Sequence, residues 1–148
     1  MVMDRLYGDV LVATDGSDAA EVAVDHALTV ANAHDASIHA LYVVDTRITM
    51  AAEDDTREAL GEQLSAQGED AVERIVERAS AEAIEASGLV ERGTPWKKIL
   101  TYAEDAAIDL IVIGTTGKTP REKRMGMGSV SERVVDDATV PVLVVPNF

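Results

Sequence analysis

Short runs of Val, Ile and Leu alternate along the chain with longer stretches in which apolar residues recur at helical spacing. The short runs, at residues 9–14, 37–44, 89–92, 110–114 and 140–145, predict strands. The longer stretches, at about 18–34, 54–86, 95–105 and 129–138, predict helices. Unbroken apolar strands separated by helices are typical of parallel sheets covered on both faces. The pattern therefore predicts one α/β domain over residues 1–148, a three-layer sandwich around a five-stranded parallel sheet.

Several polar residues mark where the predicted helices begin. Asp18 and Glu21 have the spacing of a capping box, which predicts the start of the first helix. Thr94 followed by Pro95 predicts a cap and a first helical position for a later helix. Residues 45–56 are predicted to be a mobile connection. Gly61 and Gly68 weaken the first half of the long helical pattern that follows.

Three predicted strands end close to residues that suit a binding crevice. Parallel α/β sheets bind ligands at the carboxyl ends of their strands, where the strand order reverses. Asp15, Val44 and Gly114 fall at such ends, so we expect one crevice to gather them. The Asp15 carboxylate has two interpretations: it stabilises the turn at Gly16 and the following helix start, or it accepts hydrogen bonds from a ligand.

Composition and charge narrow the class of protein. The chain carries 27 acidic and 13 basic residues, a net charge of −14, and aromatic residues make up only 3%. This acidity argues against nucleic acid as the main partner, because phosphate backbones require clustered positive charge. An excess of acids with few lysines also resembles halophilic proteins. The absence of Cys excludes disulfides and cysteine nucleophiles, and no apolar run reaches membrane-spanning length. We expect a soluble, cytoplasmic protein.

The segment from Gly114 to Val130 departs from this acidic background. Gly114 and Gly117 follow a predicted strand, and Gly128 with Ser129 precedes a predicted helix. The intervening loop holds four of the chain's basic residues, Lys118, Arg121, Lys123 and Arg124. Glycines allow close backbone approach, and the free N–H groups of a helix start bind anions. We interpret the segment as a phosphate site; an ordinary glycine-rich strand-to-helix loop is the alternative.

The sequence contains neither a P-loop nor a cluster of histidines. Gly117-Lys118-Thr119 resembles the end of a P-loop, but the required earlier glycine position is occupied by Val112. The three histidines, His26, His34 and His39, are scattered. We expect surface or capping roles for them rather than metal ligation.

Taken together, these residues resemble the universal stress protein family. The resemblance rests on the opening Val10–Ser17, the strand end at Leu41–Asp45, the strand Asp109–Gly114 and the closing Val140–Val145. Its most specific part is the family's nucleotide pattern of Gly, two residues, Gly, nine residues, then Gly and Ser or Thr. Here ten residues separate Gly117 from Gly128, and we expect the extra one to bulge outward.

The resemblance implies a Rossmann-like fold that binds ATP, with Mg²⁺ or Mn²⁺ bridging the phosphates. Asp15 and the backbone near Val43 are expected to hold the adenine and ribose, with Ala13 and Thr14 lining the pocket. The first part of the glycine segment, Gly114, Thr115 and Gly117, is expected under the ribose and α-phosphate. The second part, Gly128, Ser129 and Val130, is expected at the β- and γ-phosphates. Family members commonly dimerise through the last strand, which implies a homodimer through Val142–Val145.

Three functions are consistent with these residues. The first is an ATP-binding regulatory protein for the stress response with little or no turnover. It is favoured because no general base or water-orienting residue is evident, and Thr116 stands where many relatives have His. The second is an enzyme, a slow ATPase or another nucleotide-dependent catalyst. The third is a dimeric scaffold that has lost the ligand.

Overall fold

The strands form one parallel sheet with the order β3-β2-β1-β4-β5. The structure is a computed structural model that describes residues 6–115 and 129–146. Its strands are β1 (Asp9–Thr14), β2 (Ser37–Asp45), β3 (Ala86–Gly93), β4 (Leu110–Gly114) and β5 (Val142–Val145), and every paired neighbour runs parallel. The order reverses at β1, which lies between β2 and β4. The predicted fold class is thereby confirmed.

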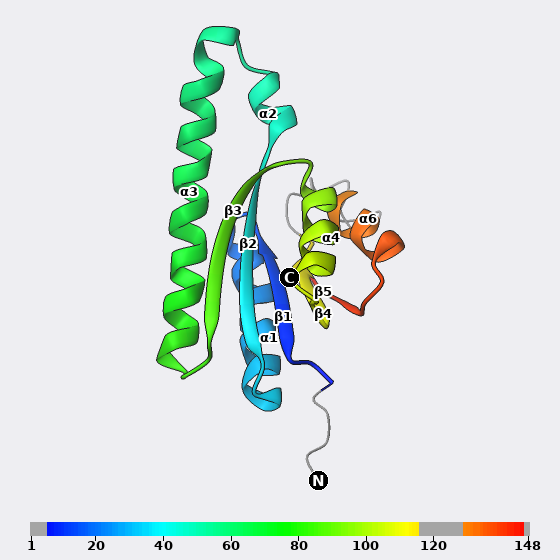
Figure 1. The fold of residues 1–148 in the computed structure, drawn as a ribbon. Helices are drawn as coiled ribbons and strands as arrows, with labels where there is room; N and C mark the ends of the chain where they lie inside the picture. Colours follow the sequence, from blue (N-terminus) through cyan, green and yellow to red (C-terminus); the bar gives the residue numbers. More distant parts are fainter. Residues whose placement is uncertain (1–5, 116–128, 147–148) are drawn as a thin grey trace.

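Helices cover both faces of the sheet (Figure 1). α1 (Asp18–His34) and α3 (Asp54–Ala81) pack on one face, while α4 (Pro95–Asp105) and α6 (Ser129–Asp137) pack on the other. The alternation of side chains along β1 explains this division. Val10 and Val12 belong to the core under α1 and α3, and Leu11 belongs to the core under α4 and α6. None of the helices within the described ranges is long and apolar enough to cross a membrane.

Residues 45–56, which the sequence predicts to be a mobile connection, contain the short helix α2 (Thr46–Met50), which was not predicted. Asp45 caps the helix by accepting a hydrogen bond from the Arg47 N–H, 2.9 Å away. At the other end, the Arg57 guanidinium donates to the carbonyl oxygens of Met50 and Ala52. α2 has no buried residue, so polar contacts at its ends hold it in place.

The cap of α1 and several element bounds also differ from the predictions: α3 ends at Ala81 instead of residue 86, and β5 begins at Val142 instead of residue 140. The residue that caps α1 is Ser17, whose hydroxyl accepts from the Ala20 N–H, and Asp18 is the first helical residue. β3 is longer than the predicted 89–92, because its pairing with β2 continues from Ala86 to Gly93. That pairing is a long-range contact, which local sequence patterns do not report.

Candidate functional site

A cavity of about 400 Å³ opens where β1, β2 and β4 end. It therefore lies at the carboxyl edge of the sheet, on the side of α4 and α6, where the strand order reverses. Its wall combines apolar side chains with a few polar groups, as is usual for small-molecule sites. The lining residues are Ala13, Thr14, Asp15, Leu41, Val43, Asp45, Ile48, Pro95, Ile99, Ile113, Gly114, Ser129, Val130 and Ser131.

Asp15 follows β1 directly and serves the turn as well as the cavity wall. Its Oδ1 accepts from the Ser17 N–H at 3.0 Å, while Gly16 adopts a left-handed conformation with φ of 80°. A carboxylate offers about four acceptor positions over its two oxygens, so this bond leaves acceptor capacity for a ligand. In this geometry Asp15 can stabilise the turn at Gly16 and still accept a hydrogen bond from a ligand, so its two interpretations from the sequence do not exclude each other.

Gly114 ends β4 at a point where the chain has no room for a side chain. An added Cβ would lie 3.3 Å from the carbonyl oxygen of Ala19, in the first turn of α1. The next residue, Thr115, donates its N–H to the Val145 carbonyl at 3.2 Å, which extends the pairing with β5. Close packing between α1 and β4 thus fixes this side of the cavity.

Two helices begin at the cavity. Pro95, the first residue of α4, and Ser129, the first residue of α6, both contribute to its wall. Helix N-termini present unpaired N–H groups and the positive end of the helix dipole. Ser131 adds a hydroxyl-bearing side chain and is only 2% exposed, although it borders the cavity. α6 packs against β5, whereas α4 packs against β2 and β3, so the α6 side of the cavity, away from β2, suits an anionic group.

The opposite side of the cavity is formed by the end of β2 and by α2. Asp45 and Ile48 lie there, and neither was among the site residues inferred from the sequence. The Arg47 guanidinium contacts Asp45 through Nη2 to Oδ2 at 2.7 Å and through Nε to Oδ1 at 3.0 Å. These hydrogen bonds hold the pKa of the Asp45 carboxyl below its usual value. Asp45 is thus a fixed, ionised group in the wall.

Seven of the ten site residues inferred from the sequence line this cavity: Ala13, Thr14, Asp15, Val43, Gly114, Ser129 and Val130. Thr115 follows directly but is not part of the wall. Gly117 and Gly128, with the basic loop between them, lie outside the described residues. Val44, which we expected in the crevice, instead faces the core under α1 and α3 and is 2% exposed. Ligand binding by these residues stays a prediction.

Several cavity residues that we did not infer from the sequence could have been inferred from their positions on the predicted strands and helices. Leu41 and Val43 face the cavity together because side chains two apart on a strand share a face. Ser131 follows Ser129 at the start of the same helix, where both reach the cavity. Asp45 directly follows a predicted strand, as Asp15 does, and this shared position could have indicated that Asp45 lies in the same crevice. Ile48 had no such signal, because α2 was not foreseen.

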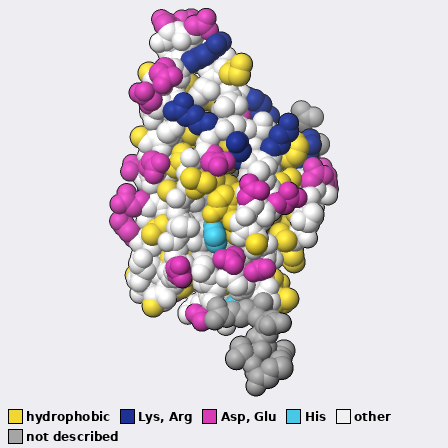
Figure 2. All heavy atoms as spheres, viewed as in Figure 1, with side chains coloured by type: hydrophobic (Ala, Val, Ile, Leu, Met, Phe, Trp, Pro, Cys, Tyr) yellow, Lys and Arg dark blue, Asp and Glu magenta, His cyan; other side chains and the backbone are white. Residues whose placement is uncertain are grey.

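Positive side chains gather near the carboxyl edge of the sheet. In Figure 2, Lys and Arg lie in the upper half of the visible face, whereas Asp and Glu are spread widely. Next to the cavity residue Pro95, the Trp96 ring lies 3.9 Å from the Arg133 guanidinium carbon and 5.4 Å from the Lys97 ammonium. These are cation–π distances. Local positive charge thus lies beside the cavity residue Pro95 in an otherwise acidic protein.

His39 does not have the surface or capping role that we expected. On the α4 side of β2, its Nε2 lies 3.0 Å from Asp9 Oδ1 and its Nδ1 lies 2.7 Å from the Tyr102 hydroxyl. Its side chain is 18% exposed and joins β1, β2 and α4 away from the cavity wall. In the ranges 6–115 and 129–146, no three His, Asp or Glu side chains are grouped to hold a metal ion.

Comparisons with known proteins agree with this geometry. The universal stress protein family matches residues 6–146. The universal stress protein MJ0531 of Methanocaldococcus jannaschii is 38% identical over 144 residues, which cover 96% of this chain and 84% of the relative. Among solved structures, M. jannaschii MJ0577 superposes with a TM-score of 0.85 at 28% identity, covering 97% of this chain and 98% of that one. The protein UspA of Lactobacillus plantarum superposes at 0.77 with 34% identity, covering 94% and 97%.

More distant structures of the same fold include nucleotide complexes. One universal stress protein was solved in complex with cAMP, with a TM-score of 0.66 and 24% identity over 95% of this chain and 97% of that one. Another, from Archaeoglobus fulgidus, was solved in complex with dAMP, with a TM-score of 0.68 and 21% identity over 94% and 98%. At these identities the likeness to the present chain is one of fold.

Proposed function

Because the chain belongs to the universal stress protein family, we propose that it binds ATP in the cavity at the carboxyl edge of its sheet and acts as a regulatory protein of the stress response. The observation that carries this proposal is the cavity itself. It joins the Asp15 carboxylate to the N-termini of α4 and α6 in one space of about 400 Å³.

The two sides of the cavity suggest how a nucleotide lies in it. The sheet order places β1 between β2 and β4, so the β2 side and the β4 side are about 10 Å apart, two strand spacings. Phosphates fit the β4 side, where α6 begins, because helix N–H groups and their dipole favour anions. The nucleoside then lies toward β2, between Asp15, Val43 and α2. Mg²⁺ or Mn²⁺ would accompany the phosphates as part of the ligand.

Binding without efficient turnover fits the placement of the acidic groups. Asp15 and Asp45 are the carboxylates in the described part of the wall, and both lie toward the nucleoside side. A general base for hydrolysis must come within hydrogen-bond reach of the attacking water, which here means the α6 side. We therefore propose slow or negligible hydrolysis. The complexes of other proteins of this fold with cAMP and dAMP support adenine as the base.

The proposal includes a homodimer formed through β5. β5 is the edge strand next to β4, and Val142, Leu143 and Val144 remain partly exposed on it. An apolar edge strand with unpaired backbone groups favours pairing with another chain. A second β5 would satisfy those groups and bury the strand.

A pair of substitutions at Ser129 tests nucleotide binding without removing the fold. Ser129→Asp places a carboxylate at the first residue of α6, where it favours the helix but repels phosphate. Ser129→Asn is the neutral control of nearly the same shape. We expect Ser129→Asp to weaken MgATP binding by calorimetry more than about tenfold, the scale of 1.4 kcal/mol, and Ser129→Asn to weaken it much less. Equal affinities of both variants for MgATP would refute the proposed phosphate position.

A further inference from the structure

Asp45 occupies a distinctive position in the cavity. It lies in the wall at the end of β2, on the side opposite the start of α6. Its side chain is 17% exposed, so it is well shielded for an ionised group. If the phosphates lie at α6, the part of a nucleotide that reaches Asp45 is the nucleoside.

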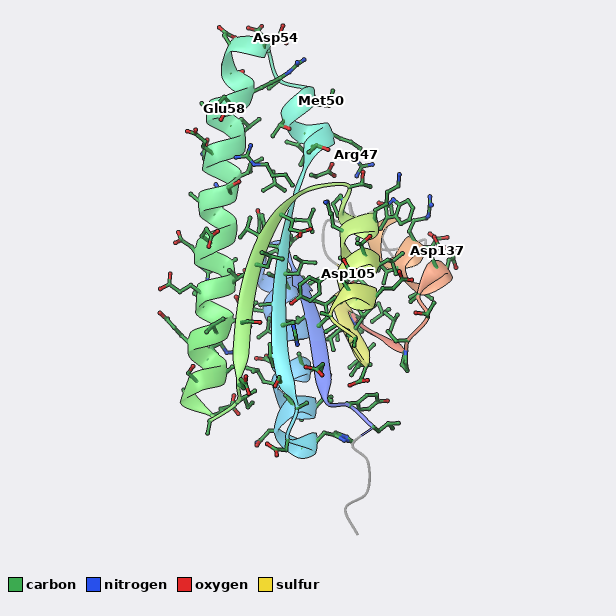
Figure 3. All side chains as sticks on the ribbon, viewed as in Figure 1. Arg47, Met50, Asp54, Glu58, Asp105 and Asp137 are labelled. Carbon is green, nitrogen blue, oxygen red and sulfur yellow. The ribbon has the colours of Figure 1, made fainter. Side chains whose placement is uncertain are left out.

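The Asp45 carboxylate is held in one orientation. Its Oδ1 accepts from the backbone N–H of Arg47 at 2.9 Å, and both oxygens accept from the Arg47 guanidinium at 2.7 to 3.2 Å. α2 itself is fixed at its far end, where Arg57 donates to two carbonyl oxygens. Figure 3 shows Arg47 and Met50 on this short helix beside the upper end of α3. The acceptor is therefore positioned before any ligand arrives.

Arg47 also changes the charge that a ligand meets. Two bare carboxylates, Asp15 and Asp45, would repel an anionic ligand from the cavity. The paired guanidinium offsets the charge of Asp45. The backbone N–H, Nε and Nη2 groups of Arg47 occupy three of the carboxylate's about four acceptor positions, which leaves about one for a ligand. A carboxylate paired in this way suits the hydroxyl and amine donors of a nucleoside.

We propose that Asp45 is a specificity-determining residue that accepts a hydrogen bond from the nucleoside, and that Arg47 is the positioning residue that orients and neutralises it. This inference rests on the proposed nucleotide function. The donor is either a ribose hydroxyl or the exocyclic amine of adenine. Both have the same chemistry toward a carboxylate, and the experiment separates them.

The test compares MgATP with the magnesium complexes of 2′-deoxyadenosine triphosphate and inosine triphosphate. Wild-type protein should lose about tenfold in affinity for whichever analogue lacks the donor, the lower range for a hydrogen bond to a charged group. In Asp45→Asn, which keeps a side-chain oxygen to cap α2, that difference should shrink below about threefold. Asp105→Asn, the same charge change at the far end of α4, should keep the wild-type ratio.

Arg47 is tested by its effect on charge. Arg47→Gln leaves Asp45 unpaired, so MgATP affinity should fall several-fold, and Asp45→Asn added to it should restore much of the loss. Arg47→Lys should retain affinity. A purely structural role in capping α2 would make the double variant no better than Arg47→Gln.

The outcomes separate the two proposals. Wild-type protein that binds none of the three nucleotides would overturn the proposed function and this inference together. Protein that binds MgATP but shows the same analogue ratios in wild type and Asp45→Asn would overturn the inference alone. Equal binding of all three nucleotides by wild type would also overturn it.

Discussion

Gly68 in α3 provides a sharp test of the packing that places the β2 end of the cavity. A Cβ at this position would lie 2.5 Å from Cδ1 and 2.9 Å from Cγ of the Tyr42 ring. Ordinary carbon contacts are about 3.5–4.0 Å, so the ring or the helix must move in Gly68→Ala. Tyr42 is 8% exposed and lies in the core between the sheet and α3, where such movement is costly.

The expected effect has two opposing contributions. Overpacking a core costs about 1–3 kcal/mol, whereas replacing Gly by Ala inside a helix gains about 1 kcal/mol. We therefore expect Gly68→Ala to lower the free energy of unfolding by up to about 2 kcal/mol. For a chain of this length that corresponds to a fall of up to roughly 8 °C in Tm.

Gly61 in the same helix is the matched control. A Cβ there would lie 3.0 Å from Nη1 of Arg92, at the end of a flexible and exposed side chain that can swing away. Gly61→Ala should lose only the 3.2 Å bond from Arg92 to Ser65 and gain helix propensity, so its stability should stay the same or rise by up to about 1 kcal/mol. Urea and thermal denaturation measure both variants. A Gly68→Ala protein as stable as Gly61→Ala would refute the packing argument.

Three further predictions follow from other parts of the structure. Burial, and to a lesser extent the charge of Asp15, raises the pKa of the Tyr42 hydroxyl above 10.0. The folded state therefore loses stability relative to the unfolded state as the pH rises from 10.0 through the raised value. Tyr42→Phe should accordingly lose less stability above pH 10 than wild type in urea denaturation, and equal losses would contradict this. MgATP should change the emission of Trp96, the only tryptophan, because its neighbour Pro95 lines the cavity; unchanged emission at saturating nucleotide would argue against that site. Val144→Lys on the edge strand β5 should convert the proposed dimer into a monomer in size-exclusion chromatography, and an unchanged elution volume would argue against dimerisation through β5.

The fold was readable from the sequence because its strongest signals are local. Five short runs of Val, Ile and Leu and four helical patterns give the order of elements. Strands that alternate with helices in this way favour a parallel sheet with helices on both faces. The length of β3 was not readable, since pairing with β2 decides it. α2 was missed because its five residues bury nothing, and its caps come from Asp45 before it and Arg57 after it.

The candidate site was partly readable for the same reason. Asp15 and Gly114 follow strand ends, so the topology alone brings them to one edge. Asp45 required knowing that α2 follows β2 with Ile48 in the cavity wall, and that the Arg47 guanidinium hydrogen-bonds the Asp45 carboxylate. His39 illustrates a different limit: its partners, Asp9 and Tyr102, are 30 and 63 residues away, and no local pattern links them.

We propose that an adenine nucleotide binds where β1, β2 and β4 end. The most direct measurement is a titration of ¹⁵N-labelled, nucleotide-stripped protein with MgATP, followed by the amide shifts of assigned residues. We expect saturable shifts at Val43, Gly114 and Val130, with little change at Ala36 and Ile84, at the opposite end of the sheet. No saturable shift at millimolar MgATP, or shifts confined to that opposite end, would contradict it.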